Sequence, residues 1–454
     1  MIRLGTPAAR TVVVGAGIAG VAVADALAAR GDGDVLLVDE RAPLTLTSAM
    51  STECYRDWWP GPDPAMALLV GRSIDLLERL SAATAGAFHM NRRGYLYATA
   101  DPARAGRWER EARELAAHGG GPLRVHRGSP DDPTYVPSPS RGIDPALRGF
   151  DLITDRALIA RHFPYLSSAA VAVLHARRCG WLSAQQLGTV LLERARAGGA
   201  RVLRGRADAI EAGRGRVRRV HVGGEAVACE RLVIAAGPGT RDVARMLGVE
   251  LPIDLEPHLK VAFRDTLGAV PRDAPFLVWS DPQRLPWDDA ERAELRVAGL
   301  GELADGTLRH GPHGRPEGGG DSVVMLWSYG EAAGPVSCDR PDPRTSEIVL
   351  RGWSAMLPAL RPYFARLPRP RIDGGYYART PENRPLIGPL PVEGAYVVGA
   401  LSGFGIMAAC GAADLAARHI LGEELPPYAE AFLFGRYADP AYRARLPEMV
   451  TGQL

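Results

Sequence analysis

Val12-Val13-Val14-Gly15-Ala16-Gly17-Ile18-Ala19-Gly20 opens the stretch that decides the fold, and Val35-Leu36-Leu37-Val38-Asp39-Glu40-Arg41 closes it. The pattern predicts a strand, a tight turn, a helix and a second strand that ends in acidic residues. Gly15 permits the turn, Gly17 lets the backbone approach a pyrophosphate, and Gly20 lets the helix pack closely on the strand. The helix N-terminus adds N–H donors and the positive end of a dipole. We therefore predict a nucleotide cofactor at this turn.

Asp39 supports this interpretation. It lies 24 residues after Gly15, where a carboxylate can accept hydrogen bonds from ribose hydroxyls. A glycine turn that binds no ligand would leave the turn and the distant acid to be explained separately. The predicted contacts in this segment are Gly15, Ala16, Gly17, Ile18, Ala19, Gly20, Asp39, Glu40 and Arg41. The fingerprint alone does not distinguish NAD from FAD, because both present a ribose and a pyrophosphate to the turn.

A second glycine-rich segment lies near the C-terminus. Residues 376–389 read Tyr376-Tyr377-Ala378-Arg379-Thr380-Pro381-Glu382-Asn383-Arg384-Pro385-Leu386-Ile387-Gly388-Pro389, and a predicted strand at 395–399 leads into Ala400-Leu401-Ser402-Gly403-Phe404-Gly405-Ile406-Met407. This segment resembles the closing signature of the D-amino-acid-oxidase superfamily of FAD enzymes, especially its sarcosine oxidase, glycine oxidase and dimethylglycine dehydrogenase branches. The family pattern is close to T-P-D-x-x-P-x-I-G, a strand and G-x-S-G-H-G. Here Glu382 stands where Asp is usual, and Phe404 replaces the common His near the flavin.

The resemblance implies FAD as the cofactor, with a helix N-terminus facing the O2 and N1 edge of the isoalloxazine. Matching motifs occur in family order near residues 12–56, 88–100, 158–186, 198–240, 252–264 and 374–436. Further implied contacts are Ser48, Ala49, Met50, Ser51, Ala207, Ala236, Gly237, Gly399, Ser402, Gly403, Phe404, Gly405, Ile406 and Met407. Noncovalent FAD is expected: Gly375 stands where some sarcosine oxidases carry a tethering Cys, and the tethering His of dimethylglycine dehydrogenases is missing.

The fold class is expected to be mixed α/β, a Rossmann-type FAD-binding domain interwoven with an antiparallel-sheet substrate domain. We assign residues 1–86, 151–250 and 371–440 to the FAD-binding domain, 87–150 and 251–370 to the substrate domain, and 441–454 to a C-terminal tail. In the substrate domain, residues 93–98 and 323–327 are predicted strands. Residues 117–148 and 281–321 are rich in Gly, Pro and charge and are predicted to be long loops.

The composition is typical of a large globular protein, with 46% hydrophobic residues over 454 positions. The net charge of +2 gives no general attraction to nucleic acid or to an anionic membrane. No apolar run reaches the roughly 20 residues that span a bilayer. The first strand begins near residue 11, which leaves no room for a signal peptide, so a cytoplasmic location is expected. The five cysteines are scattered and form no C-x-x-C, which indicates neither a disulfide framework nor a metal site.

Lys260 is the one lysine among 54 basic residues; the others are arginines. A desolvated lysine can give up its proton whereas an arginine cannot, so Lys260 is a candidate catalytic residue. His258 and Lys260 share one face of a predicted strand. Several flavin oxidases of the superfamily use a lysine near flavin N5 to promote reaction with oxygen, and Lys260 could be similar. A surface lysine that survived by chance is an equally weighted alternative.

A carboxylate-bearing substrate needs a cation, and a bidentate guanidinium is its natural partner. The resemblance to sarcosine oxidases places Arg56 on a carboxylate-binding arginine, while a flavin-side lysine of that branch falls on Met407. A second candidate pair is His313 and Arg315, although a solvated loop there is as plausible. Trp59 and Tyr377 could contribute aromatic walls for an amine, or could be ordinary core residues.

The resemblance implies oxidation of a carbon–nitrogen bond of a small amine or amino acid, with an imine product. Proton abstraction from the substrate ammonium needs a base, for which His258 and Tyr377 are candidates. Electrons would pass to O2, giving H2O2, or to a protein or quinone acceptor. Assigning the chain as a flavin monooxygenase or as an NAD-dependent dehydrogenase would leave the C-terminal signature unexplained. A non-catalytic subunit of a larger complex and a homo-oligomer remain open.

Overall fold

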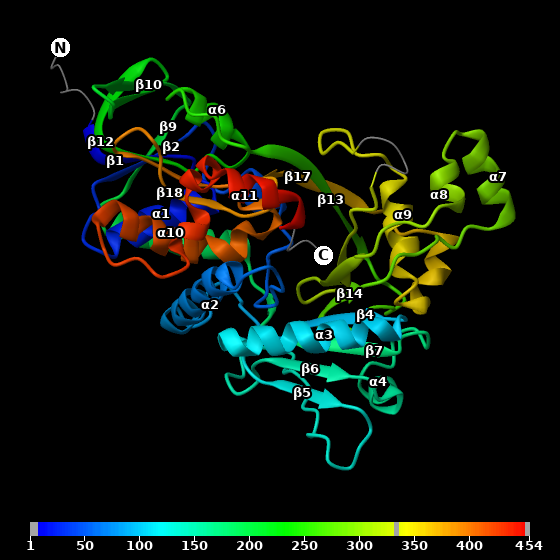
Figure 1. The fold of residues 1–454 in the computed structure, drawn as a ribbon. Helices are drawn as coiled ribbons and strands as arrows, with labels where there is room; N and C mark the ends of the chain where they lie inside the picture. Colours follow the sequence, from blue (N-terminus) through cyan, green and yellow to red (C-terminus); the bar gives the residue numbers. More distant parts are fainter. Residues whose placement is uncertain (1–7, 331–335, 450–454) are drawn as a thin grey trace.

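The computed structural model describes residues 8–330 and 336–449. It is a mixed α/β structure built on two large sheets that lie side by side (Figure 1). The first sheet has a parallel centre in the order β9-β2-β1-β12-β19, extended by antiparallel strands at its margins. Its strands are β1 (Ala8–Val14), β2 (Val35–Asp39), β9 (Arg201–Arg204), β10 (Ala207–Gly213), β11 (Arg216–Val222), β12 (Glu225–Ile234), β18 (Leu386–Pro389) and β19 (Ala395–Gly399).

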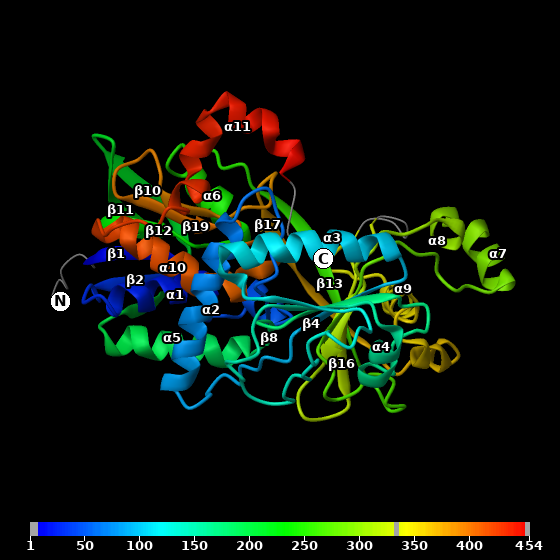
Figure 2. The ribbon, with the colours of Figure 1, turned by 60° about the horizontal axis from the view of Figure 1, so that its bottom comes forward.

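Helices lie on this side of the molecule, and most of them pack against the sheet or against one another (Figure 2). They are α1 (Ile18–Ala28), α2 (Ala65–Ala83), α5 (Ala184–Ala197), α6 (Thr240–Arg245), α10 (Gly405–Leu421) and α11 (Pro440–Arg445). α10 contacts both α1 and α2, and its small residues allow the close approach. Contrary to the expectation from the sequence, the stretch Ser402–Leu421 is long and apolar enough to cross a membrane, but 78% of its apolar window is buried inside the fold. It is therefore accounted for as a core helix.

The second sheet has the order β17-β13-β16-β15-β14-β4-β7-β6-β5. Its pairs are antiparallel except β14 with β4 and β5 with β6. The strands are β4 (Tyr95–Thr99), β5 (Leu123–His126), β6 (Phe150–Ile153), β7 (Ala172–Ala176), β13 (Asp254–Arg264), β14 (Phe276–Trp279), β15 (His313–Pro316), β16 (Ser322–Leu326) and β17 (Arg371–Arg379). Helices α3 (Pro102–Leu115), α4 (Arg156–His162), α7 (Asp289–Val297), α8 (Gly301–Asp305) and α9 (Thr345–Trp353) lie on this side, and β3 (Cys54–Tyr55) pairs with β8 (Gly180–Trp181) separately.

The chain crosses between the sheets at other points than the predicted boundaries. β6 and β7 belong to the second sheet, although 151–250 was assigned to the cofactor side. β17 also belongs there, because it pairs with β13 from Asp254↔Arg379 to Ala262↔Arg371. The predicted strands at 93–98 and 323–327 correspond to β4 and β16.

The two predicted long loops contain regular structure. Residues 117–148 include β5, and residues 281–321 include α7, α8 and β15. α7 begins with a capping box: the Asp288 carboxylate accepts from the Glu291 N–H, and the Glu291 carboxylate accepts from the Asp288 N–H, both at 2.8 Å. That D-x-x-E pattern is a local helix-start signal that the Gly and Pro content around it obscured.

The predicted C-terminal tail packs on the fold as far as it is described, and residues 450–454 lie outside the described part. Tyr442 of α11 donates a hydrogen bond to the Glu382 carboxylate at 3.0 Å. Glu382 is fully buried and also accepts from Arg436 Nη2 at 2.6 Å and from Tyr437 at 2.8 Å. Burial alone would raise the pKa of Glu382, but the Arg436 charge and these donors lower it overall. The longer Glu side chain, in place of the usual Asp, thus holds the C-terminal segment.

Substituting Glu382→Gln should lower the free energy of unfolding by about 3 kcal/mol, because Arg436 would keep its buried charge without a counter-ion. Denaturant unfolding followed by circular dichroism measures this. Since folding lowers the Glu382 pKa, its contribution is present above the pKa of the unfolded chain and is lost as the pH falls through the folded value. The matched control is Glu393→Gln in the exposed pair with Arg216, expected to cost under about 1 kcal/mol. Equal losses in the two variants would contradict this reading.

Candidate cofactor and substrate site

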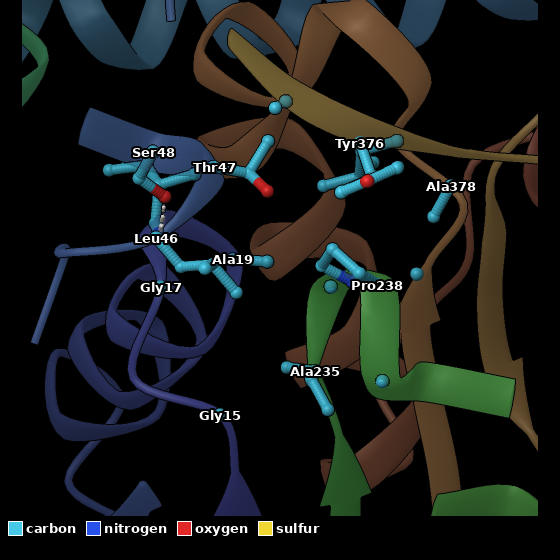
Figure 3. A pocket seen from close by; sticks show the side chains of 18 of the residues that line it. Gly15, Gly17, Ala19, Leu46, Thr47, Ser48, Ala235, Pro238, Tyr376 and Ala378 are labelled. Atoms are coloured by element: carbon cyan, nitrogen blue, oxygen red, sulfur yellow. Dashed lines mark hydrogen bonds between the residues drawn. The ribbon is translucent and has the colours of Figure 1, made fainter. Parts of the chain in front are cut away.

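A long cavity of about 370 Å³ runs along the carboxyl ends of the parallel strands of the first sheet and ends at the second sheet. In open α/β sheets ligands bind at this edge. Figure 3 shows the glycine turn at Gly15 and Gly17 on one side, with Ser48 above it, and Pro238 and Tyr376 across the space. The cavity is therefore bordered by segments that are far apart in the sequence.

The glycine turn explains one end of the cavity. Gly15 has φ +108°, and a Cβ there would lie 2.3 Å from the backbone oxygen of Ala235. Gly17, the N-cap of α1, has no side chain to close the helix end, and the Ile18 N–H donates to Ser48 Oγ at 3.0 Å. The helix N-terminus thus faces a cavity, as an anion-binding turn requires.

Asp39 fixes the same turn from the second strand. One of its carboxylate oxygens accepts from the Ala16 N–H at 2.8 Å, and the other accepts from the Arg41 N–H at 2.9 Å. Asp39 also lines the cavity, so a carboxylate with remaining acceptor capacity borders the position where a ribose would lie. The site fits the adenosine half of the expected cofactor.

The other end is formed after β19. Ala400 and Ser402 have φ of +54° and +46°, which turns the chain sharply into α10. Ser402 is 9% exposed, lines the cavity, and its Oγ has no hydrogen-bond partner among the described residues. A buried hydroxyl without a partner is costly unless a ligand satisfies it. Together with the N-terminus of α10, this orphaned hydroxyl fits the polar edge of a flavin.

Most predicted cofactor contacts line this cavity. They are Gly15, Gly17, Ile18, Ala19, Asp39, Glu40, Arg41, Ser48, Met50, Ser51, Ala207, Ala236, Gly237, Gly399, Ser402, Gly403, Gly405 and Ile406. Ala16, Gly20 and Ala49 lie outside the lining, and Gly20 packs instead, since a Cβ there would lie 1.9 Å from the Gly15 oxygen. The lining residues that sequence reasoning missed include Leu46, Thr47, Arg206 and Pro238, which lie within two residues of predicted positions.

A smaller chamber of about 70 Å³ adjoins the cavity and shares with it Thr52, His258, Leu326, Tyr377 and Gly403. Its lining is Thr52, Cys54, Arg56, Tyr95, His258, Leu259, Phe276, His313, Leu326, Ser328, Tyr377, Gly403, Phe404 and Met407. Phe404 and Met407, predicted as cofactor contacts, therefore face this chamber and not the long cavity. A small aromatic-walled chamber with one arginine beside the flavin end is suited to a small substrate with an anionic group.

Arg56 is 6% exposed, and its side chain contacts two neighbouring tryptophans. Its Nε donates to the Trp58 carbonyl at 3.2 Å, and its guanidinium lies 4.4 Å from the Trp59 ring centroid. Trp59, predicted to contact substrate, lines neither cavity, because it packs edge-on against Phe404 at 5.1 Å. Trp59 therefore positions Arg56 from the core.

His313 and Arg315 lie on the same face of β15, because alternate residues of a strand point the same way, but they have different surroundings. His313 lines the chamber, its Nδ1 donates to the Gly311 carbonyl at 2.6 Å, and burial lowers its pKa to about 4, so it is neutral. Arg315 lines neither cavity. It donates to the Thr52 carbonyl at 2.9 Å and pairs with Glu53 at 3.3 Å, so its predicted substrate contact is replaced by a structural one.

The three predicted catalytic residues meet at the junction of the two spaces. Lys260 lines the long cavity, where Nζ lies 3.2 Å from Asp373 and donates to the Ser51 carbonyl at 3.2 Å. It is thus not a chance surface lysine. Tyr377 stacks on His258 at a centroid distance of 3.8 Å, and burial raises the Tyr377 pKa to about 12. Tyr377 therefore keeps its proton near neutral pH and is unsuited to act as the base.

Comparisons with known proteins agree with this geometry. Residues 10–419 match the family model described as DAO, FAD dependent oxidoreductase. L-proline dehydrogenase from P. horikoshii superposes with a TM-score of 0.71 and 18% identity, covering 95% of this chain and 98% of that one. Glycine oxidase from Bacillus cereus gives 0.66 and 15%, covering 94% and 98%, and iminodiacetate oxidase from Chelativorans sp. BNC1 gives 0.67 and 17%, covering 93% and 98%. No curated protein matches the chain by sequence.

Proposed function

The chain belongs to the DAO family of FAD-dependent oxidoreductases, and from this premise we propose that it oxidises the carbon–nitrogen bond of a small amino or imino acid. The observation that carries the proposal is Arg56 in the small chamber beside the flavin end of the cavity. Three similar structures are described as acting on proline, glycine and iminodiacetate, which supports a small carboxylate-bearing amine.

The residues of this chain would position such a substrate. Arg56 presents a planar guanidinium that can bind a carboxylate through two hydrogen bonds. The aromatic walls, Tyr95, Phe276 and Phe404, exclude water, which strengthens that charged contact and favours a neutral amine. Bound FAD would supply the two-electron acceptor for the hydrogen on the carbon beside the nitrogen. The resulting imine is hydrolysed by water.

FAD is proposed to be held without a covalent bond. Gly375, which carries no side chain, lies on the cavity wall near Thr47 and Met50. Acid precipitation of the purified protein should therefore leave the yellow colour in the supernatant. Colour retained in the pellet would contradict the proposal.

Anaerobic titration of the purified yellow protein tests the reaction itself. The panel pairs each amino acid, primary, N-methyl or cyclic, with the amine that lacks its carboxylate. Bleaching of the visible spectrum by the amino acids in preference to the amines supports the proposal. A protein that every amine bleaches equally, or that no compound bleaches, would contradict it.

Lys260 is proposed to promote the reaction of reduced enzyme with O2, because its ammonium borders the flavin end of the cavity. Substituting Lys260→Met should slow reoxidation in air by about 10²-fold, the effect typical of removing one positioned electrostatic donor. Stopped-flow mixing of the reduced protein with oxygen measures it. Lys260→Arg keeps the charge and serves as the control. Equal reoxidation rates in Lys260→Met and wild type would show that Lys260 does not promote the reaction with O2. Slow reoxidation of the wild type itself would indicate a protein or quinone acceptor.

A further inference from the structure

His258 stands between the long cavity and the chamber, and it links two polar side chains. On one side its Nδ1 lies 3.0 Å from Ser328 Oγ, just beyond the end of β16. On the other side its Nε2 lies 3.1 Å from Glu256 Oε1, two residues earlier on β13. Glu256 in turn pairs with Arg379 of the neighbouring strand. Ser328, His258 and Glu256 thus form a continuous polar chain that begins at the chamber wall.

The charge of Glu256 sets the protonation of this chain. The contact with His258, followed by Arg379, lowers the Glu256 pKa to about 2, so its carboxylate is ionised and can only accept. The Nε2–Oε1 contact is in ion-pair range without the alignment of a linear hydrogen bond. An anion beside Nε2 still favours the tautomer with the proton on Nε2. Nδ1 of the neutral ring is then an acceptor, and the Ser328 hydroxyl donates to it.

We propose that Ser328, His258 and Glu256 form a proton relay that removes the proton from the bound substrate ammonium. The N–H of the substrate donates to Ser328 Oγ, whose own proton moves to His258 Nδ1. One N–H bond of the substrate breaks, one N–H bond on the imidazole forms, and the serine ends as it began. The charge moves from substrate to imidazolium, where the Glu256 carboxylate stabilises it. No oxidant takes part in this step, which rests on the proposed function.

The surrounding groups support this direction of transfer. Tyr377, stacked on the imidazole, is neutral and adds no charge. Lys260, on the same face of β13, is paired with Asp373, which offsets its repulsion of an imidazolium. On the chamber side the charged and titratable groups are Arg56, Cys54, Tyr95 and His313. Burial raises the pKa of Tyr95, so that hydroxyl stays neutral, and Cys338 Sγ lies 3.8 Å from the His258 carbonyl. His313 is a poor alternative, since burial lowers its pKa to about 4.

The test measures the rate of anaerobic bleaching by a bleaching amino acid as a function of pH. At neutral pH, Ser328→Ala and His258→Gln should each slow bleaching by about 10²–10⁴-fold, the usual contribution of a general base. In both variants only pre-formed neutral amine reacts, so the rate should rise about tenfold per pH unit below the amine pKa. The double variant should lose no more than either single variant, because the residues act as a unit.

Three controls separate the relay from a structural role. Ser328→Thr keeps the hydroxyl and should recover most of the rate. Ser322→Ala removes a hydroxyl at the start of β16 and should change nothing. A carboxylate that lacks the nitrogen should perturb the flavin spectrum with the same Kd in Ser328→Ala and wild type. If amino acids bleach the wild type and the variants keep its rate and pH profile, the relay is wrong and the proposed function stands. The same conclusion follows if the loss of rate in the double variant equals the product of the two single losses. A wild type that no compound bleaches would overturn the proposed function and the relay with it.

Discussion

Substituting Gly15→Ala should yield a protein that does not retain FAD through gel filtration. The added Cβ would lie 2.3 Å from the Ala235 backbone oxygen, and that atom belongs to the turn at the end of β12, where no flexible side chain can move aside. Gly15 also has φ +108°, a conformation in which any other residue is strained by about 1–3 kcal/mol. A free turn that relaxes to relieve this strain must be driven back when FAD binds, which at 1.4 kcal/mol per factor of ten weakens binding by up to about a hundredfold, and the clash adds to it.

Two further Gly→Ala variants serve as controls for the Gly15→Ala result. Gly71→Ala in α2 meets no atom within 4 Å and improves helix propensity, so its FAD content should equal wild type and its stability should rise by up to about 1 kcal/mol. Gly17 has an ordinary φ of −73°, and its Cβ would meet only Ser48 Oγ at 3.4 Å. Gly17→Ala should therefore fold normally while binding FAD more weakly. Absorbance of the bound flavin and thermal unfolding measure both effects, and full FAD content in Gly15→Ala would contradict the prediction.

Substituting Arg56→Met should raise the apparent Kd for amino acid substrates by about 10²–10³-fold. A buried, hydrogen-bonded charge pair that loses one partner costs about 2–5 kcal/mol, and the substrate carboxylate would be left in an aromatic chamber without a counter-ion. The dependence of the anaerobic bleaching rate on substrate concentration gives this constant separately from the limiting rate. The limiting rate should fall less, because the proposed contact of Arg56 is with the carboxylate and not with the reacting bond.

Decarboxylated amines provide the internal control for Arg56. They carry no group for the guanidinium, so Arg56→Met should bind them no worse than wild type. Trp59→Leu removes the ring 4.4 Å from the guanidinium and should produce a smaller increase in Kd in the same direction. An increase of equal size for amines and amino acids in Arg56→Met would show that the arginine supports the chamber wall and does not bind a carboxylate.

The cofactor half of the site could be located from the sequence because its signals are local. Gly20 is required by its contact with the Gly15 backbone within one strand-turn-helix unit, Gly15 has the positive φ that glycine adopts without strain, and Asp39 ends the next strand. The missed contacts at Leu46, Thr47 and Pro238 lie in or beside short 3-10 turns between strands and helices, and the path of these connections depends on the elements they join. A window of two or three residues around each motif would have included them.

The substrate half depended on pairing between distant strands. Ser328 meets His258 because β16 pairs with β13, and no spacing rule connects residues 70 positions apart. Helix α7 was missed although its capping box is visible in the sequence, because Gly and Pro on either side dominated the pattern. The predicted domain boundaries differ from the observed ones because of distant strand pairing. β17 was expected on the cofactor side, but it joins the second sheet by pairing with β13 over its full length.

The sequence by itself determined the family, the mixed α/β class and the two glycine turns that border the cofactor cavity. These features follow from steric limits on φ and from helix ends, which act over a few residues. The tertiary structure decided which arginine faces the chamber. Arg56 lines it, whereas Arg315 donates hydrogen bonds to Thr52 and Glu53, more than 260 positions away in the sequence. It also decided that His258 is linked to Ser328 and Glu256. Side-chain partners are set by long-range strand register, which composition and spacing do not encode.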